Sequence, residues 1–274
     1  MATLGIDIGA SKIRFVVWEK RVLKEAEIKL VSRNRSEIKD IFQEIFQKTA
    51  GLKISSIGVG VPGTVQEGTI LTGFNLPSIV GWDLKQELEK IFKIPAKIVG
   101  DAQAFVVAEA TIGAAQGKTQ VVGLTLGSGL GTGLFLNGQI YLGNGKAGTI
   151  GREILNLETQ EEAEDFASAK FFKRLGEDPH TLQEKAKAGN HDAQMIYRQF
   201  GQNLGIVIAN LVNLLDPQVI VLGGGIANAY PLFIESLKST AIPLIAIPHR
   251  EDIEVIPAKL GPSGGAIGAA LLAG

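Results

Sequence analysis

The sequence predicts an α/β protein made of two related lobes. The first hundred residues alternate glycine-linked strands and helices in the order β-β-β-α-β-α-β, and the residues that follow begin a similar series. Hydrophobic residues make up 45% of the chain and charged residues 20%, which is typical of a packed core. The ligand of such a protein is expected in a cleft between the lobes. We expect residues 1–101 and 262–274 to form a smaller lobe and residues 102–261 a larger one.

Hydrophobic spacing predicts the elements of the first lobe. Ile38, Phe42 and Ile45 share one face of a helix over Ser36–Gly51. Asp83, with Gln86 three residues later, caps a second helix. Runs rich in β-branched residues between turn residues predict strands at Thr3–Ile8, Ile13–Glu19, Val22–Lys29, Ile54–Val61 and Ala96–Val99.

The same reasoning predicts the rest of the chain. Helices are expected at Ala102–Gln116, about Glu161–Leu175, about His191–Leu215, Tyr230–Thr240 and Gly264–Ala273. Strands are expected at Gln120–Leu126, Gly133–Leu136, Gln139–Leu142, Val219–Leu222 and Ile253–Ile256.

The composition excludes several classes of function. The net charge is −1 with no long basic run, so nucleic acid is not an expected partner. The absence of cysteine excludes disulfides, thiolate zinc sites and cysteine nucleophiles. No signal peptide or membrane-spanning stretch is recognisable, so we expect a cytoplasmic protein without a membrane partner. The histidines, His180, His191 and His249, lie outside every motif and are expected on the surface or in loops.

Glycine is the most unusual feature of the composition. The 34 glycines amount to about 12% of the chain, against about 7% in an average protein. They gather at strand ends instead of forming a linker. Because glycine lets backbone N–H groups approach a ligand closely, such clusters indicate anion binding by the backbone.

The first candidate phosphate site is the turn after the first strand. The backbone at Gly9 and the hydroxyl of Ser11 can donate hydrogen bonds to phosphate oxygens, and Lys12 can add positive charge. Asp7 can hold Mg²⁺ through water. An ordinary hairpin turn would explain the same residues.

Two further glycine segments follow later strands. Leu126–Gly133 repeats the position of the first turn in the second half, and alternating glycines between strands favour phosphate binding over packing. Val221–Gly225 ends a buried strand in three glycines, which predicts a flat wall for a nucleoside or, alternatively, a closely packed turn. The candidate residues are Gly127, Gly129, Gly131, Thr132, Gly223, Gly224 and Gly225.

Two familiar motifs are rejected because of their context. Gly58–Gly63 matches G-x-G-x-x-G, but a turn and a strand are expected after it, where a dinucleotide fold requires a helix. Gly113–Thr119 is one residue short of a P-loop and follows a helix, so it is interpreted as a helix end.

Asp101 is the candidate catalytic base. It follows a strand and opens a helix, whose dipole favours the ionised carboxylate. In phosphoryl transfer an aspartate of ordinary pKa can orient the attacking hydroxyl and take its proton late. A plain helix N-cap is the alternative interpretation.

Together these segments resemble those of the ROK (repressor, open reading frame, kinase) sugar kinases, a family of the actin-like ATPase superfamily, over nearly the whole chain. The resemblance implies the two-lobed, ribonuclease H-like fold with ATP and sugar in the cleft. It implies transfer of the γ-phosphate of MgATP to a hexose hydroxyl, as in glucokinases, by a homodimer. It implies Asp101 as the base, with Gly63 and Asn75 near the sugar. The segments that carry it are LGIDIGASKIRFVV, GVGVPGTV, Asn75-Leu76-Pro77, Gly81-Trp82, GDAQAFVVAEA, LGSGLGTGLFLNGQIYLGNGKAG and NLVNLLDPQVIVLGGGIA.

Three positions depart from the family pattern. Gly100 stands where the family usually has asparagine. Thr149 and Arg152 stand where it has the Glu and His that bind sugar hydroxyls, and the His is often also a zinc ligand. The cysteine-rich zinc loop is missing, so no zinc is expected. Arg152 could bind a larger or charged acceptor, or form an ordinary ion pair near Glu153.

The leading hypothesis is therefore an ATP-dependent hexose kinase. A kinase for a different or modified sugar is the first alternative, and a nucleotide- or sugar-binding sensor without turnover is the second. Polyphosphate is a further possible donor, although no lysine-rich track favours it.

Overall fold

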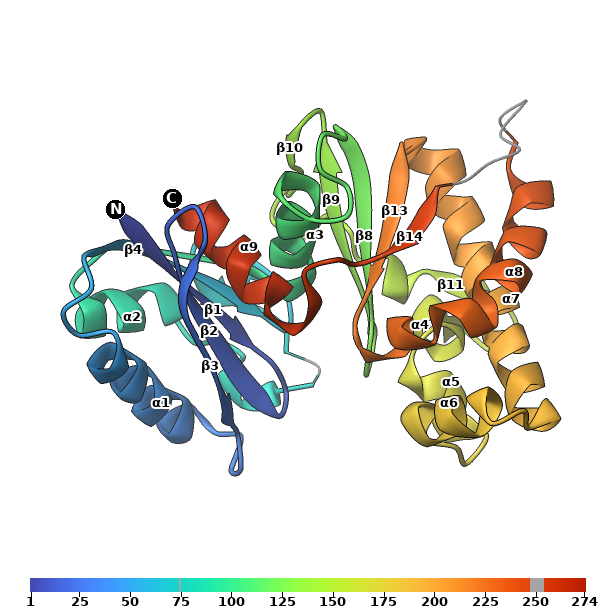
Figure 1. Ribbon diagram of the computed structural model, residues 1–274, viewed down its shortest axis with the longest axis horizontal. Helices are drawn as coiled ribbons and strands as arrows, with labels where there is room; N and C mark the ends of the chain where they lie inside the picture. The colour runs from blue at the N-terminus through green and yellow to red at the C-terminus, as the bar shows by residue number, and fades with distance from the viewer. Residues whose placement is uncertain (74, 247–253) are drawn as a thin grey trace. The chain divides into compact units, whose positions relative to one another are not determined.

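The computed structural model describes residues 1–73, 75–246 and 254–274, which form two compact units (Figure 1). Unit 1 comprises residues 1–116, 139–147 and 259–274, and unit 2 comprises residues 117–138 and 148–258. The helix after Gly100 therefore groups with the first unit, whereas the sequence analysis assigned it to the larger lobe. None of the helices in the described ranges is long and apolar enough to cross a membrane.

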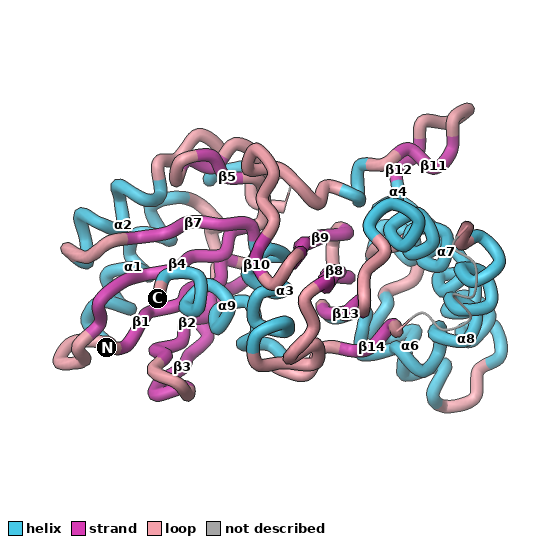
Figure 2. The backbone as a smooth tube through the Cα atoms, turned by 90° about the horizontal axis from the view of Figure 1, so that it is seen from above, coloured by secondary structure: helices cyan, strands magenta, loops and turns pink. Residues whose placement is uncertain are grey.

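A five-stranded sheet with the order β3-β2-β1-β4-β7 forms the centre of unit 1 (Figure 2). The first three strands are antiparallel, whereas β1, β4 and β7 run parallel, so their carboxyl ends meet at one edge. The strands are β1 (Ala2–Ile8), β2 (Lys12–Trp18), β3 (Val22–Lys29), β4 (Ile54–Val61) and β7 (Ala96–Gly100), and a small hairpin joins β5 (Val65–Gln66) to β6 (Thr69–Ile70).

Helices cover both faces of this sheet (Figure 1). On one face, α1 (Arg35–Lys48) and α2 (Leu84–Phe92) bury their apolar sides against Ile6 and Phe15 in a continuous core. Both begin at side-chain caps: Asn34 accepts from the Glu37 N–H and Asp83 from the Gln86 N–H, as expected for Asp83. On the other face lie α3 (Asp101–Thr111) and α9 (Gly264–Ala273).

The α9 helix approaches the sheet so closely that only glycine fits beneath it. A Cβ atom at Gly5 would lie 1.9 Å from the carbonyl oxygen of Ala266, and one at Gly58 would lie 1.7 Å from that of Ala269. A Cβ at Gly268 would lie 1.8 Å from the Ala104 oxygen on α3. These glycines are therefore requirements of helix–sheet and helix–helix packing.

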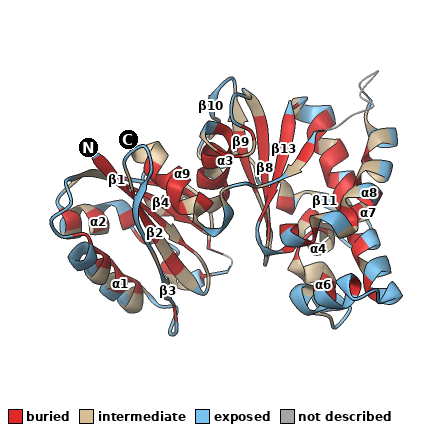
Figure 3. Ribbon diagram, viewed as in Figure 1, coloured by how far each residue is buried: buried red, intermediate tan, exposed pale blue. Residues whose placement is uncertain are grey.

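Unit 2 repeats the strand arrangement, as expected from the sequence. Its strands pair in the order β9-β8-β13-β14, in which β8 pairs antiparallel with β9 and parallel with β13. The helices α7 (His191–Leu215) and α8 (Tyr230–Ala241) pack against each other, and the buried rings of Phe200 and Phe233 meet edge to face between them. Figure 3 shows buried segments along both helices. The strands of unit 2 are β8 (Gln120–Leu126), β9 (Leu130–Leu136), β13 (Val219–Gly223) and β14 (Val255–Pro257), whereas β10 (Gln139–Ile140) lies within the 139–147 stretch of unit 1.

The prediction of a single helix over about Glu161–Leu175 is wrong. The segment holds β12 (Glu161–Glu162), which pairs with β11 (Ile154–Asn156), then α4 (Ala163–Phe166) and α5 (Ala169–Arg174). Ser168 causes the interruption, because its hydroxyl donates to the Glu164 carbonyl and accepts from the Lys170 N–H, which starts a new helix.

Other boundaries differ in smaller ways. The α3 helix ends at Thr111, five residues before the expected end, and β9 begins at Leu130 instead of Gly133. The sequence analysis did not predict α6 (Pro179–Lys187), which Asp178 caps, because few apolar residues mark it. Ile253 and His249, which were assigned to a strand and to the surface, lie outside the described residues.

Gly58→Ala should destabilise the protein by about 2 kcal/mol or more, because the new methyl group would collide with a backbone carbonyl that cannot rotate away. Thermal or urea unfolding measures this loss. Gly264→Ala is the control, on α9 itself, the helix that Gly58 of β4 faces. The atoms nearest the new Cβ would lie at 3.5 and 3.9 Å, so this variant should be as stable as the wild type or slightly more stable. Equal stability of the two variants would contradict the close approach of α9.

Candidate active site

Two partly buried carboxylates, Asp7 and Asp101, meet at the carboxyl edge of the unit 1 sheet. Asp7 lies in register with Gly60 of β4, and Gly60 lies in register with Val99 of β7, two residues before Asp101. A Cβ atom at Gly60 would lie 3.6 Å from Asp7 Oδ1 and 3.5 Å from the Asp101 Cα. The bare backbone of Gly60 is thus all that β4 places between the two aspartates.

Burial makes both aspartates weaker acids than usual. The pKa of Asp7 is raised to about 7, mainly by desolvation and next by the nearby charge of Asp101, whereas the charge of Arg14 lowers it. Desolvation also raises the pKa of Asp101 to about 6, although N–H groups at the start of α3 lower it. One of them, from Ala102, donates to Asp101 Oδ1 over 2.7 Å. The expectation of an ordinary pKa for Asp101 is therefore wrong, because desolvation outweighs the helix N-terminus.

The turn after β1 holds the other predicted residues of the first phosphate motif. The Gly9 N–H donates to the Lys12 carbonyl over 2.9 Å, which closes the hairpin that also contains Ser11. The Lys12 ammonium lies 3.1 Å from a carboxylate oxygen of Glu27 on β3. Lys12 is therefore an ion-pair partner of Glu27 in this structure.

The sequence analysis missed Arg14, which lies in register with Asp7 on β2 and pairs with Glu27 over 2.6 Å. It is the cation whose charge lowers the pKa of Asp7. Its position two residues beyond Lys12 places both cations on the same face of β2, and this alternation was the available signal.

The sequence analysis also missed Gly265 as a site residue. A Cβ atom at this position would lie 2.9 Å from Asp7 Oδ2, so the first turn of α9 contacts the carboxylate. The available signal in the sequence was the pair of glycines at the start of a small-residue helix. Of the two, only Gly265 is close to the carboxylate, because a Cβ atom at Gly264 would have no neighbour nearer than 3.5 Å.

The predicted sugar-side residues divide into two groups. Gly63 has a φ of 152° and lies beside the start of α3: a Cβ at Gly100 would lie 3.1 Å from its carbonyl oxygen. The structure therefore brings Gly63 close to Asp101. Asn75 is exposed in the turn before Pro77–Ile79 and makes no hydrogen bond to Asp101 within the described part of the chain.

In unit 2, the two later glycine segments come together. They follow β8 and β13, which are adjacent parallel strands, so both lie at the same sheet edge. Gly224 has a φ of 85°, and a Cβ there would lie 2.3 Å from the Leu126 oxygen. Gly127 and Gly225 have no atom within 4 Å of a Cβ position, which leaves open space beside both turns. Thr132, also a predicted phosphate residue, is buried on β9, and its hydroxyl has no hydrogen-bond partner among the residues that the structure describes.

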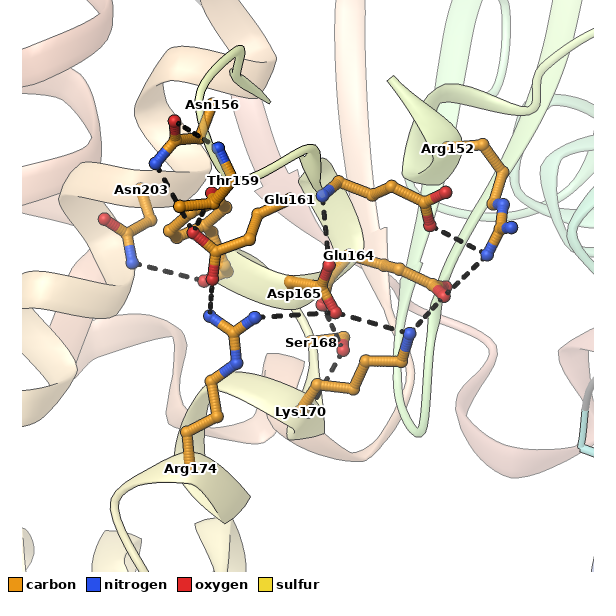
Figure 4. A network of polar contacts seen from close by, with 12 residues as sticks. Arg152, Asn156, Thr159, Glu161, Glu164, Asp165, Ser168, Lys170, Arg174 and Asn203 are labelled. Carbon is orange, nitrogen blue, oxygen red and sulfur yellow. Dashed lines mark hydrogen bonds and ion pairs between the residues drawn. The ribbon is translucent and has the colours of Figure 1, made fainter. Parts of the chain in front are cut away.

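Arg152 belongs to a network of ion pairs around α4 and α5 (Figure 4). Its guanidinium lies 2.7 Å from Glu162 and 3.6 Å from Glu164, and 44% of the side chain is exposed. Lys170 also pairs with Glu164, over 2.6 Å. These ion pairs agree with the alternative of an ordinary salt-bridge arginine. Neighbouring Glu153 accepts a hydrogen bond from Asn210 on α7.

Known proteins match the whole chain. Residues 3–274 match the sequence profile of the ROK family. The N-acetyl-D-glucosamine kinase of Pectobacterium atrosepticum is 30% identical over an alignment 303 positions long, gaps included, which covers 98% of this chain and 97% of that protein.

Solved structures agree with this match. The ROK hexokinase of Thermus thermophilus is 27% identical, with a TM-score of 0.82 over 100% of this chain and 98% of that one. The ROK glucokinase of Streptomyces griseus, solved with glucose and AMPPNP, has a TM-score of 0.88 over 100% and 99% at 24% identity, a likeness of fold. The two-lobed fold expected from the sequence is confirmed.

Asp7→Asn should stabilise the protein at pH 8. Since the native pKa of Asp7 is above the usual value of 3.8, ionising it costs more in the fold than in the unfolded chain. The cost is absent below about pH 4 and fully developed above pH 7, so the gain in unfolding free energy should reach about 2 to 4 kcal/mol at pH 8 and vanish at pH 4. Urea unfolding between these limits measures it.

The control is Asp40→Asn, which changes an exposed aspartate on α1 of the same unit and should give no such pH-dependent gain. If Asp7→Asn raised the free energy of unfolding equally at pH 4 and pH 8, the result would contradict the raised pKa of Asp7.

Proposed function

Because the chain belongs to the ROK family, we propose that it is an ATP-dependent sugar kinase that transfers the γ-phosphate of ATP to a hexose hydroxyl. The observation that carries the proposal is the pair of partly buried carboxylates on either side of Gly60, beside a glycine turn. A sugar kinase needs a base for the acceptor hydroxyl and a group that holds the metal of the nucleotide, and two aspartates with separate environments supply both.

Asp101 is the proposed base. A carboxyl group with a pKa of about 6 is largely ionised at neutral pH, yet it is a better proton acceptor than an ordinary aspartate. The Ala102 N–H bond fixes Oδ1, so the group is held in place before the acceptor binds. Its role is to orient the attacking hydroxyl and to take the proton as the new bond to phosphorus forms.

Asp7 is the proposed partner of Mg²⁺. The fit rests on charge: the two neighbouring carboxylates repel each other, and a divalent cation beside Asp7 would stabilise its ionised form against the desolvation and the Asp101 charge that raise its pKa. Bound there through water, magnesium would neutralise charge on the phosphate oxygens. The oxygen-only character of Asp7 suits this hard cation.

The glycine turns are the proposed phosphate and nucleoside sites. Gly9, Ser11 and Lys12 belong to the turn beside Asp7, with Arg14 as a second cation nearby. In unit 2 the open space beside Gly127 and Gly225 supports a role for these segments in ATP binding.

The acceptor is proposed to be glucose or a related hexose near Gly63 and Asn75, with an N-acetylated hexosamine as the second candidate. The second candidate is favoured by the names of the similar proteins, which include N-acetyl-D-glucosamine kinases. Thr149 and Arg152 replace the family's usual sugar contacts, so the acceptor preference of this chain is proposed to depend on them. Following the family, the enzyme is expected to act as a homodimer in the cytoplasm, where ATP is available.

Asp101→Asn should lower turnover at least about 1000-fold while ATP binding survives, because the amide cannot accept the proton. An ADP-release assay over hexoses and N-acetylated hexosamines, with polyphosphate as an alternative donor, measures the loss. Asp83→Asn is the matched control, since Asp83 caps α2 and asparagine caps a helix equally well, so turnover and stability should both stay close to the wild type. ATP binding without turnover on any acceptor would favour the sensor and overturn the proposal.

Replacing Thr149 by Glu and Arg152 by His together should raise kcat/KM for glucose about tenfold or more, because the pair restores groups that hydrogen-bond sugar hydroxyls. The comparison of kcat/KM for glucose with that for N-acetylglucosamine measures the change in preference. Arg174→His is the control, since it removes another arginine of the same ion-pair network, paired with Glu161 over 2.7 Å. An equal effect of Arg174→His would show that the network, not sugar contact, sets the preference.

A further inference from the structure

Glu109 is a fully buried carboxylate that the proposed chemistry does not use. It lies near the end of α3, two helical turns after Asp101, and only 1% of its surface is exposed. No ion pair joins it in the described ranges of the chain. A buried charge without a counter-ion needs several good hydrogen bonds, so its partners are informative.

Three backbone N–H groups satisfy this carboxylate. Oε2 accepts from Ala114 over 2.7 Å, and Oε1 accepts from Leu260 over 3.0 Å. Lys259 donates to both oxygens, over 3.1 and 3.2 Å. Gly113 is required for this arrangement, because a Cβ atom there would lie 2.2 Å from Oε2.

The bonded amides hold the two chain segments at which unit 1 is interrupted. Ala114 lies two residues before the last residue of the first stretch, 1–116, and Lys259 is the first residue of the last stretch, 259–274. Lys259 and Leu260 lie outside helices and strands, so the carboxylate supplies the order that secondary structure does not.

Glu109 and the backbone amides of Ala114, Lys259 and Leu260 that bond to it, called the Glu109 clamp below, also connect the two helices that flank the aspartates. After Leu260 the turn Gly261–Ser263 leads directly into α9, whose Gly265 contacts Asp7. The α3 helix begins with Asp101 and packs against α9 at Ala104 and Gly268. The carboxylate of Glu109 therefore joins the end of α3, the helix that begins with Asp101, to the start of α9, the helix whose Gly265 contacts Asp7.

We propose that Glu109 is a positioning residue for phosphoryl transfer: by fixing Lys259 and Leu260 to α3, it sets the placement of α9 against Asp7 and of Asp101 beside it. The inference rests on the proposed kinase function. It assigns Glu109 no contact with either substrate, so its loss should change the rate of the chemical step more than substrate binding.

Glu109→Gln should lower kcat at least about tenfold, because the amide places N–H groups against the backbone donors and shifts α9. The KM for ATP and the KM for the sugar should each change by less than about threefold, because Glu109 contacts neither substrate. The kcat of Glu109→Asp, which keeps the carboxylate on a shorter side chain, should lie between that of Glu109→Gln and that of the wild type. If Glu109→Gln does not fold, Glu109→Asp carries the same comparison of kcat with KM.

Glu37→Gln is the matched control. Glu37 also accepts two backbone N–H bonds in unit 1, from Val31 over 2.6 Å and Arg33 over 2.7 Å, but it lies on α1, on the opposite face of the sheet. It should lose stability and keep kcat within about twofold of the wild type. A kcat of Glu109→Gln that is as close to the wild-type value would overturn the positioning role.

Hydrogen exchange in the wild-type protein tests the clamp without any variant or turnover. The amides of Lys259 and Leu260 should exchange on the order of 100-fold more slowly than expected for an open loop. Rapid exchange at both would overturn the clamp. Wild-type protein that shows this protection but phosphorylates no acceptor would contradict the proposed function and the positioning role, and leave the clamp standing.

Discussion

The close packing of α9 on the sheet of unit 1 is the constraint on which the site depends. Backbone carbonyls of α9 lie where Cβ atoms of Gly5 and Gly58 would be. This approach removes water from the carboxyl ends of β1 and β4, and the desolvation raises the pKa of Asp7. The raised pKa of the Asp7 carboxyl group is therefore a consequence of close packing by small residues.

Much of the fold could be predicted from the sequence because local signals agreed with the final packing. The bounds of α7 and α9 and the cap at Asp83 were correct, since regular apolar spacing and caps act within a few residues. The break at Ser168 was missed because a serine within a polar helical segment gives no strong stop signal. The helix at 179–187 was missed because its buried face is small.

The site could be predicted in part, for the same physical reason. Glycine turns and the aspartates follow strands, and the parallel order of β1, β4 and β7 places them at one edge. Strand alternation and paired glycines were signals for Arg14 and Gly265, but neither signal shows that the residue contacts Asp7. Glu109 gave no local signal, because its partners Lys259 and Leu260 lie far away in the sequence. The pKa of Asp101 was misjudged because a helix N-terminus is visible in a sequence, whereas the extent of desolvation is not.

The division of unit 1 among three stretches of chain has a consequence for synthesis. The helix that completes its packing, α9, is encoded after all of unit 2, although its partners β1 and β4 are among the first residues made. During synthesis, the sheet of unit 1 can therefore complete its packing only after the chain of unit 2 has been made, and until then Gly5 and Gly58 lack the helix that covers them. Such long sequence separation slows folding and leaves apolar strands exposed for longer.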